Sequence, residues 1–174
     1  MMSGKLTRIK SYAKLQRIRY IMIYYVFMAL PLVALMIQDW KTRTVNSLWL
    51  LLLFFLAAAG SIVTNGISAA ISFFCINIVI LLLVGVVLYA YSRVRRKSLN
   101  ELGGLGDYLF FAALAPLYRP ESYVRAAVVM LIFSLLLWLA LKKRYKLTSI
   151  PLISFCGIPL IVMVSALVWR SING

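Results

Sequence analysis

Few side chains in this chain of 174 residues can do acid–base or nucleophilic chemistry. The chain has no histidine, two cysteines and four acidic residues. A Ser-His-Asp or Cys-His hydrolase is excluded because both need a histidine. Two lone cysteines without histidine cannot build a zinc site. Hydrolysis by this chain would therefore have to depend on carboxylates, and these belong to Asp39, Glu101, Asp107 and Glu121.

The composition is that of a membrane protein. Hydrophobic residues make up 64% of the chain and charged residues 13%, about half the charged fraction of an ordinary soluble domain. The net charge of +15 comes from 19 Lys and Arg against four acids. These bases sit in short clusters between apolar runs, as in the loops of membrane proteins. We therefore expect the lipid bilayer, and not nucleic acid, as the partner of the basic residues.

Six apolar runs define the elements that must position the acids. A helix that crosses the hydrocarbon core needs about 20 apolar residues. The runs cover residues 20–37, 47–63, 67–91, 108–118, 123–141 and 148–168. They predict an all-α polytopic membrane protein with about six transmembrane helices. We expect one six-helix membrane domain over residues 20–170, behind a basic tail over residues 1–19 that either lies on the lipid headgroups or has no regular structure.

The fourth run is unusual because residues 108–118 are too few to cross a membrane. The segment can span only if it includes Gly103 to Asp107, which gives about 24 Å of helix. Asp107 would then lie below the membrane surface, where an ionisable group marks a functional site by default. In the alternative, the segment is a re-entrant or interfacial hairpin with Asp107 in water.

The distribution of bases predicts the orientation. The loops at 38–46, 92–107 and 142–147 lie on one face and carry ten Lys and Arg between them. Since short cytoplasmic loops are rich in bases, we expect these three loops in the cytoplasm and the chain in the cytoplasmic (inner) membrane. The six bases of the N-terminal tail lie on the opposite face and favour the reverse orientation.

With this topology, Asp39 and Asp107 lie at the same membrane face on different helices. Glu101 lies in a basic loop, where it neutralises neighbouring charges, and Glu121 lies on the far side beside arginines. Two carboxylates that share a site cannot both ionise cheaply, so one keeps its proton. The ionised member can take a proton from water while the neutral one polarises a scissile carbonyl. In the alternative interpretation, each Asp is an ordinary helix-end residue, with Asp39 following a helix and Asp107 capping one.

The residues before Asp107 form a Gly-x-Gly-Asp motif that opens a membrane segment. Gly103, Gly104 and Gly106 precede the acid. Glycines allow irregular backbone and let a substrate backbone approach the carboxylate closely. The motif lies opposite a second Asp, and this placement favours a function in peptide hydrolysis.

From these residues, the chain resembles the type IV prepilin peptidase and archaeal preflagellin peptidase family of intramembrane aspartyl proteases. The resemblance covers residues 34–117, with a weaker match at 150–159. In that family the first catalytic Asp opens a short basic stretch that ends in Ile-Pro-Asn before the next helix. The stretch from Asp39 is similar, except that Val45 runs directly into Asn46 without the Pro.

The second half of the family pattern is also present with one departure. After Asp107 the chain keeps the Ala-Ala-Leu of the family at residues 112–114, but Leu109 stands where a Lys is common. That departure removes a cation beside the proposed pair of acids, which affects the expected pH optimum and substrate preference.

The resemblance implies an aspartic endopeptidase that removes the basic leader from type IV pilin-like or archaellin-like precursors at the cytoplasmic face, without metal or cofactor. Asp39 and Asp107 are then the catalytic residues, and the residues that shape the site are Gly103, Gly104, Gly106 and Asn46. Bifunctional relatives also carry a methyltransferase domain with paired Cys-x-x-Cys motifs. Cys75 and Cys156 are lone residues inside apolar runs, so we expect the short form of the family and interpret both as small buried hydrophobic side chains. The oligomeric state stays open.

Two other interpretations have different consequences. Presenilin-type proteases also use Gly-x-Gly-Asp, but they carry Tyr-Asp on the first catalytic helix and a later Pro-Ala-Leu. This chain has Gln38 before Asp39 and no Pro-Ala-Leu. A small membrane transporter or pilus-assembly scaffold could instead use Asp39 and Asp107 as proton or cation sites. A transporter would give proton-coupled uptake and no cleavage.

Overall fold

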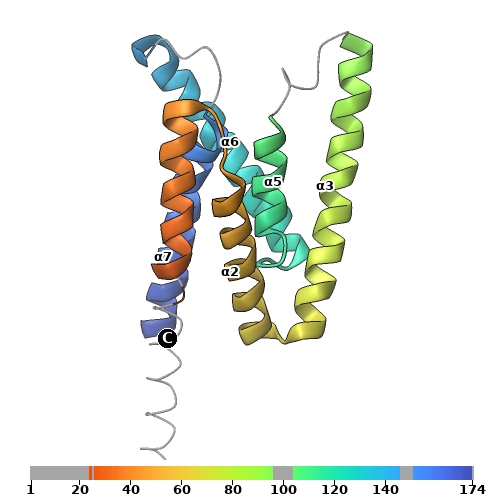
Figure 1. The fold of residues 1–174 in the computed structure, drawn as a ribbon, viewed down its shortest axis with the longest axis vertical. Helices are drawn as coiled ribbons and strands as arrows, with labels where there is room; N and C mark the ends of the chain where they lie inside the picture. Colours follow the sequence, from red (N-terminus) through yellow and green to blue (C-terminus); the bar gives the residue numbers. More distant parts are fainter. Residues whose placement is uncertain (1–23, 25, 96–103, 146–150, 174) are drawn as a thin grey trace, which may run out of the picture.

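The computed structural model describes residues 24, 26–95, 104–145 and 151–173. Within these ranges the chain is helical and contains no strand, which confirms the predicted all-α class. A first helix covers residues 26–42. The other helices are α2 (Ser47–Asn65), α3 (Ile67–Arg95), α5 (Leu105–Leu114), α6 (Pro120–Tyr145) and α7 (Leu152–Asn173) (Figure 1). The basic tail, Glu101 and Gly103 lie outside the described residues.

Three of the described helices are long and apolar enough to cross a membrane. They are α2, α3 and the part of α6 from Pro120 to Lys142. α5 and the first half of α7, Leu152–Val162, are shorter apolar helices. These elements are typical of a membrane protein. The number of candidate spans in the described ranges is three, half of the predicted six.

The first helix extends further than the apolar pattern predicts. The apolar run stops at residue 37, but the helix continues to 42, so Asp39 lies within its last turns and does not follow it. The hydroxyl of Thr42 donates to the carbonyl of Gln38 at 3.0 Å. Arg43 then ends the helix in the left-handed region, at φ 56°, and its N–H donates to the carbonyl of Asp39. A left-handed residue is a common helix stop, although glycine usually occupies it.

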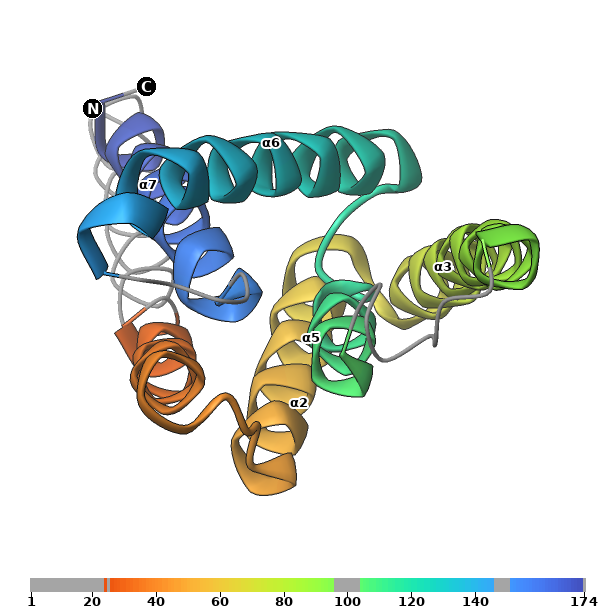
Figure 2. The same cartoon turned by 90° about the horizontal axis from the view of Figure 1, so that it is seen from above.

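The helices alternate in direction, so their connections gather at two ends. The 43–46 turn, the end of α3 and the starts of α5 and α7 lie at one end, the upper one in Figure 1. We call this the loop end. Seen from above, α7 lies between the first helix and α6, whereas α5 lies between α2 and α3 (Figure 2). Two three-helix groups therefore meet at the centre of the molecule.

The core runs between these two groups. Its fully buried hydrophobic side chains come from every described helix except α3, and the largest include Leu35, Leu53, Phe110, Met130 and Ile153. α3 packs on one side only. Its other side leaves apolar side chains such as Val87 66% exposed, as expected for a helix that faces lipid.

The position of Cys75 corrects one prediction. Both cysteines were expected to be buried, but Cys75 is exposed on α3 and only Cys156 is buried, on α7. The apolar sequence around Cys75 cannot distinguish a lipid-facing position from a core position, because both are hydrophobic.

α5 is shorter than the fourth run predicts because the chain turns back after it. It has ten residues, about 15 Å of helix. Asn77 of α3 is fully buried, and its amide donates to the carbonyls of Ala115 and Tyr118 at 2.7 and 2.8 Å. The hydroxyl of Tyr123, from α6, donates to the carbonyl of Phe111 at 3.0 Å. These bonds satisfy backbone carbonyl groups at the end of α5 and in the turn that follows it. From the apolar local sequence alone, the helix would be predicted to continue through this turn.

Candidate active site

Asp39 is held at the start of α7. The side chain is 6% exposed. Its Oδ2 accepts a hydrogen bond from the backbone N–H of Ser154 at 2.9 Å, and Ser154 Oγ lies 3.0 Å from the same oxygen. Ser154 Oγ also lies 2.8 Å from the carbonyl oxygen of Met36. Asp39 is therefore bound to a helix residue that lies 115 positions away in the sequence.

The first helix and α7 can approach closely at this point because of a glycine. A Cβ added to Gly157 would collide with the Met36 side chain. The rings of Trp40 and Phe155 lie 5.9 Å apart across the same interface. This close packing brings the N-terminal turn of α7 to the level of Asp39.

Asp107 lies in the first turn of α5, at the same end of the bundle and outside the three candidate spans. Its N–H donates to the carbonyl of Gly104 at 3.0 Å, and its Oδ2 accepts from the Gly104 N–H at 3.2 Å. Asp107 therefore helps to cap α5 from the third helical position, whereas the N-cap residue is Gly104. Burial raises the pKa of the Asp107 carboxyl from 3.8 to about 6. The Gly104 bond lowers this pKa and the nearby negative charge of Asp39 raises it.

Gly106 brings the start of α5 against the turn that follows the first helix. A Cβ on Gly106 would lie 2.6 Å from Cγ2 and 3.3 Å from Cβ of Val45. The two acids are thus carried by segments in direct contact, and their carboxyl groups are close enough to interact electrostatically. Cys156 of α7 lies within the same electrostatic range of both acids.

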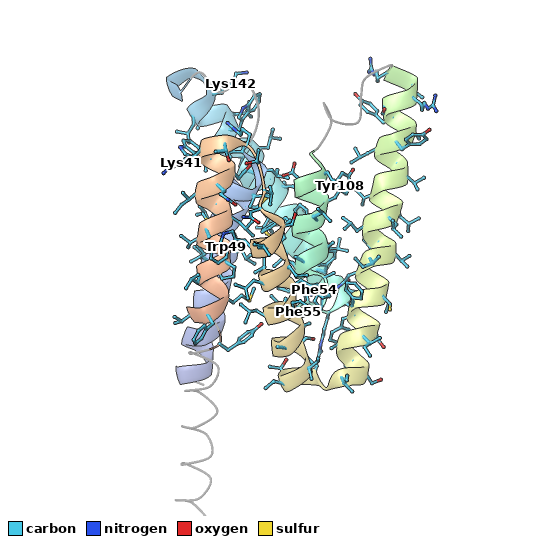
Figure 3. The ribbon with its side chains drawn as sticks, in the orientation of Figure 1. Lys41, Trp49, Phe54, Phe55, Tyr108 and Lys142 are labelled. Carbon is cyan, nitrogen blue, oxygen red and sulfur yellow. The ribbon has the colours of Figure 1, made fainter. Side chains whose placement is uncertain are left out.

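Basic and aromatic side chains are among the others at the loop end. Figure 3 shows Lys41 and Lys142 near this end, with Tyr108 extending from α5 toward α3. The Tyr108 ring comes within 3.9 Å of the position of a Cβ on Gly85 of α3. Tyr108 is also close enough to Asp107 to interact with it electrostatically.

The remaining predicted site residues have structural positions. Asn46 is exposed and caps α2, with Oδ1 accepting from the Leu48 N–H at 2.9 Å. Its own N–H donates to Gln38 Oε1 at 3.2 Å, which closes the turn after Asp39. Gly104 is the N-cap of α5, and a Cβ there would make only an ordinary contact with Asp107 Oδ2 at 3.6 Å. Neither residue needs a substrate to explain it.

Glu121 lies far from the pair of acids. It is exposed at the start of α6, beyond the turn at the other end of α5. Arg125 Nε donates to the backbone carbonyl of Glu121 at 3.3 Å. The structure thus leaves Asp39 and Asp107 as the acids that come together among the described residues.

Sequence reasoning missed Ser154 and Val45. Ser154 had a weak signal, since it is a polar residue shortly after Pro151 at the start of an apolar run, a pattern typical of a helix N-terminus. Val45 had none, because an apolar residue in a short loop does not reveal its contact.

The described residues contain no group of three or more His, Cys, Asp or Glu that could hold a metal ion.

Comparisons with known proteins identify no family for the chain. No family model, no curated protein and no solved structure matches the chain. The resemblance to prepilin peptidases therefore depends on the two Asp motifs alone.

Proposed function

We propose that the chain is an intramembrane aspartyl endopeptidase that removes the basic leader from type IV pilin-like or archaellin-like precursors at the cytoplasmic membrane face. One observation carries the proposal. Two carboxylates from different helices lie at one end of the bundle in unlike environments. Both acids are largely buried. Asp39 accepts from the N–H of Ser154 and lies within hydrogen-bond distance of its hydroxyl, whereas Asp107 accepts one bond, from the N–H of Gly104, and burial raises its pKa.

Unlike environments assign the acid and base roles to separate carboxylates. The ionised acid takes a proton from water, and the protonated acid donates to the carbonyl oxygen of the scissile bond. A pair of equivalent acids would also share one proton, but either acid could then hold it. The neighbouring Gly-x-Gly-Asp motif supports peptide hydrolysis over other uses of such a pair.

Cleavage of a defined precursor tests the proposal. The purified chain in liposomes is mixed with a precursor that has a short basic leader, a Gly before the cut site and an apolar run of about 20 residues. Mass spectrometry should find one cut directly after the Gly. Proton-coupled uptake into the liposomes with no cleavage would favour the transporter alternative and contradict the proposal.

We further propose that six helices cross the cytoplasmic membrane. The shortest crossing is made by α5 after its first turn together with the turn that follows it, and the loop end, including Asp107, lies in the cytoplasm. Thr42 and Asn65 are exposed at opposite ends of the bundle. In a chain with both native cysteines replaced by serine, Thr42→Cys should resist an impermeant thiol reagent in intact cells, and Asn65→Cys should react. Labelling of Thr42→Cys before permeabilisation would show that the loop end faces outward, where cytoplasmic leaders could not reach the two acids.

The pKa of Asp107 predicts the pH dependence of cleavage. Since the proposed mechanism needs Asp107 protonated and its pKa is about 6, kcat/KM of the free enzyme should fall as the pH rises through about 6. The fall should approach tenfold per pH unit above that point, measured from about pH 4.5 to about pH 8.5. A rate that stays constant up to about pH 8 would contradict the role of Asp107 as the proton donor.

A further inference from the structure

The start of α7 provides Asp39 with a backbone N–H donor that makes no hydrogen bond within α7. The first intrahelical bond at this end runs from the Phe155 N–H to the carbonyl of Pro151, at 3.1 Å. The N–H groups of the preceding residues therefore have no partner within α7. The Ser154 N–H donates to Asp39. Helix N-termini favour negative charge, so this position stabilises an ionised carboxylate.

The bonds to Asp39 are concentrated on one oxygen. Both Ser154 groups lie within hydrogen-bond distance of Oδ2, and no described residue donates to Oδ1. Rotation of the carboxylate is thereby restricted. Oδ1 is therefore the oxygen that the described residues leave without a hydrogen bond, and the one with capacity to accept a proton.

The Ser154 hydroxyl distinguishes the two charge states of Asp39. It has one proton and two acceptors within reach, the carbonyl oxygen of Met36 and Asp39 Oδ2. When Asp39 is ionised, its charge attracts this proton, because a hydrogen bond to a charged acceptor is stronger than one to a neutral acceptor. When Asp39 is neutral, the hydroxyl can donate to Met36 and leave no donor unpaired.

Among the described residues, the titratable side chains that the packed helices bring near Asp39 are those of Asp107 and Cys156, and neither is a cation. α2 carries no acidic or basic side chain, α5 presents Asp107 and α7 presents Cys156. Lys41, on the same helix as Asp39, is exposed. Among the described residues, Ser154 and the start of α7 are therefore the groups that stabilise a charge on Asp39 directly.

We propose, on the basis of the proposed peptidase function, that Ser154 is a positioning residue that keeps Asp39 as the ionised member of the pair and leaves Oδ1 to receive the proton of the attacking water. Water gives this proton to Oδ1 as its oxygen bonds to the carbonyl carbon, and Asp107 gives its proton to the carbonyl oxygen. Oδ1 then passes its proton to the amine nitrogen as the C–N bond breaks. One hydroxyl of the diol returns a proton to Asp107.

Infrared spectroscopy tests the assignment without any substrate. Asp39 and Asp107 are the only two aspartates in the sequence, so labelling with ¹³C-aspartate reports on them alone. Below the Asp107 pKa of about 6, we expect one carboxylate band and one protonated carboxyl band. Asp39→Asn should remove the first and Asp107→Asn the second, while Ser154→Ala should shift the carboxylate band only. Loss of the carboxylate band in Asp107→Asn, or an unshifted band in Ser154→Ala, would overturn the proposal.

Kinetics of the full chain in liposomes provide the second readout. Ser154→Ala should lower kcat about tenfold with KM unchanged, and Ser154→Thr, which keeps the hydroxyl, should restore it. Ser134→Ala is the matched control, because Ser134 is fully buried on α6 and its hydroxyl has no hydrogen-bond partner among the described residues. It should leave kcat unchanged.

The outcomes separate this inference from the proposed function. Wild-type kcat in Ser154→Ala, or equal losses in Ser154→Ala and Ser154→Thr at equal thermal stability, would overturn the positioning role while cleavage by the wild type still stands. If the wild type cleaves no precursor, the proposed function fails. The infrared bands then still decide which aspartate is ionised.

Discussion

Asp39→Asn and Asp107→Asn should each lower the rate of precursor cleavage by about 10²–10⁴-fold, the range that general acid–base groups contribute. The two substitutions remove opposite functions. An asparagine in place of Asp39 cannot take a proton from water, and an asparagine in place of Asp107 cannot donate an acidic proton to the carbonyl oxygen. The rate is measured in liposomes with equal amounts of inserted protein.

Asparagine is the informative substitution because it preserves the packing. In Asp39→Asn the side-chain amide oxygen can still accept from the N–H of Ser154, so the start of α7 keeps its partner. Asp39→Ala would leave that buried N–H unpaired, at a cost of about 1–3 kcal/mol. A loss of activity in the alanine variant would therefore not separate catalysis from folding.

Glu121→Gln is the matched control for these variants. Its carboxylate is exposed and lies at the start of α6, and a solvated surface charge contributes little. It should cleave at the wild-type rate. An Asp107→Asn chain that cleaves as fast as this control would contradict the proposed mechanism.

The apolar runs predicted most of the helices and some of their starts. Residues 47–63 and 67–91 correspond to α2 and α3, and both helices begin at the predicted residue, Ser47 and Ile67. Local residues mark both boundaries. Asn46 caps the start of α2, and Gly66, at φ 88°, forms the turn before α3. Local signals of this kind depend only on neighbouring residues, so a sequence contains them.

The features that were missed depend on contacts between distant segments. α5 ends early because Asn77 binds the turn after it, 38 residues away in the sequence. Ser154 meets Asp39 across 115 residues. The sequence pattern predicted that the two acids lie at one end of the bundle. Their different environments come from contacts between distant segments, which the periodicity of apolar residues does not encode.

Gly106 also has a different role from the one its motif suggests. The sequence favoured a glycine that lets a substrate backbone approach the acids. In the structure, Gly106 lies against Val45 of the same chain, with no room for a methyl group. Its function is then to set the spacing between the first turn of α5 and the turn after the first helix, and so between Asp107 and Asp39.

Gly106→Ala should therefore lower kcat about 100-fold with the chain still inserted, because a displacement of about 1 Å in a reacting group can cost that much. The added methyl would have to push α5 away from Val45. Val45→Ala removes the Cγ2 atom that lies 2.6 Å from the new Cβ. The double variant should therefore recover most of the rate, measured with the same precursor and liposomes.

Gly85→Ala is the matched control for this series, since a Cβ there meets only Tyr108, at 3.9 Å, among the described residues. Gly66 is unsuitable, because its φ of 88° would strain any other residue whatever the space around it. A spacing role requires that Val45→Ala rescue Gly106→Ala and that Gly85→Ala cleave normally. If Gly106→Ala is inactive and Val45→Ala does not restore it, the methyl group must obstruct the substrate directly, and Gly106 would belong to the binding surface that the motif first suggested.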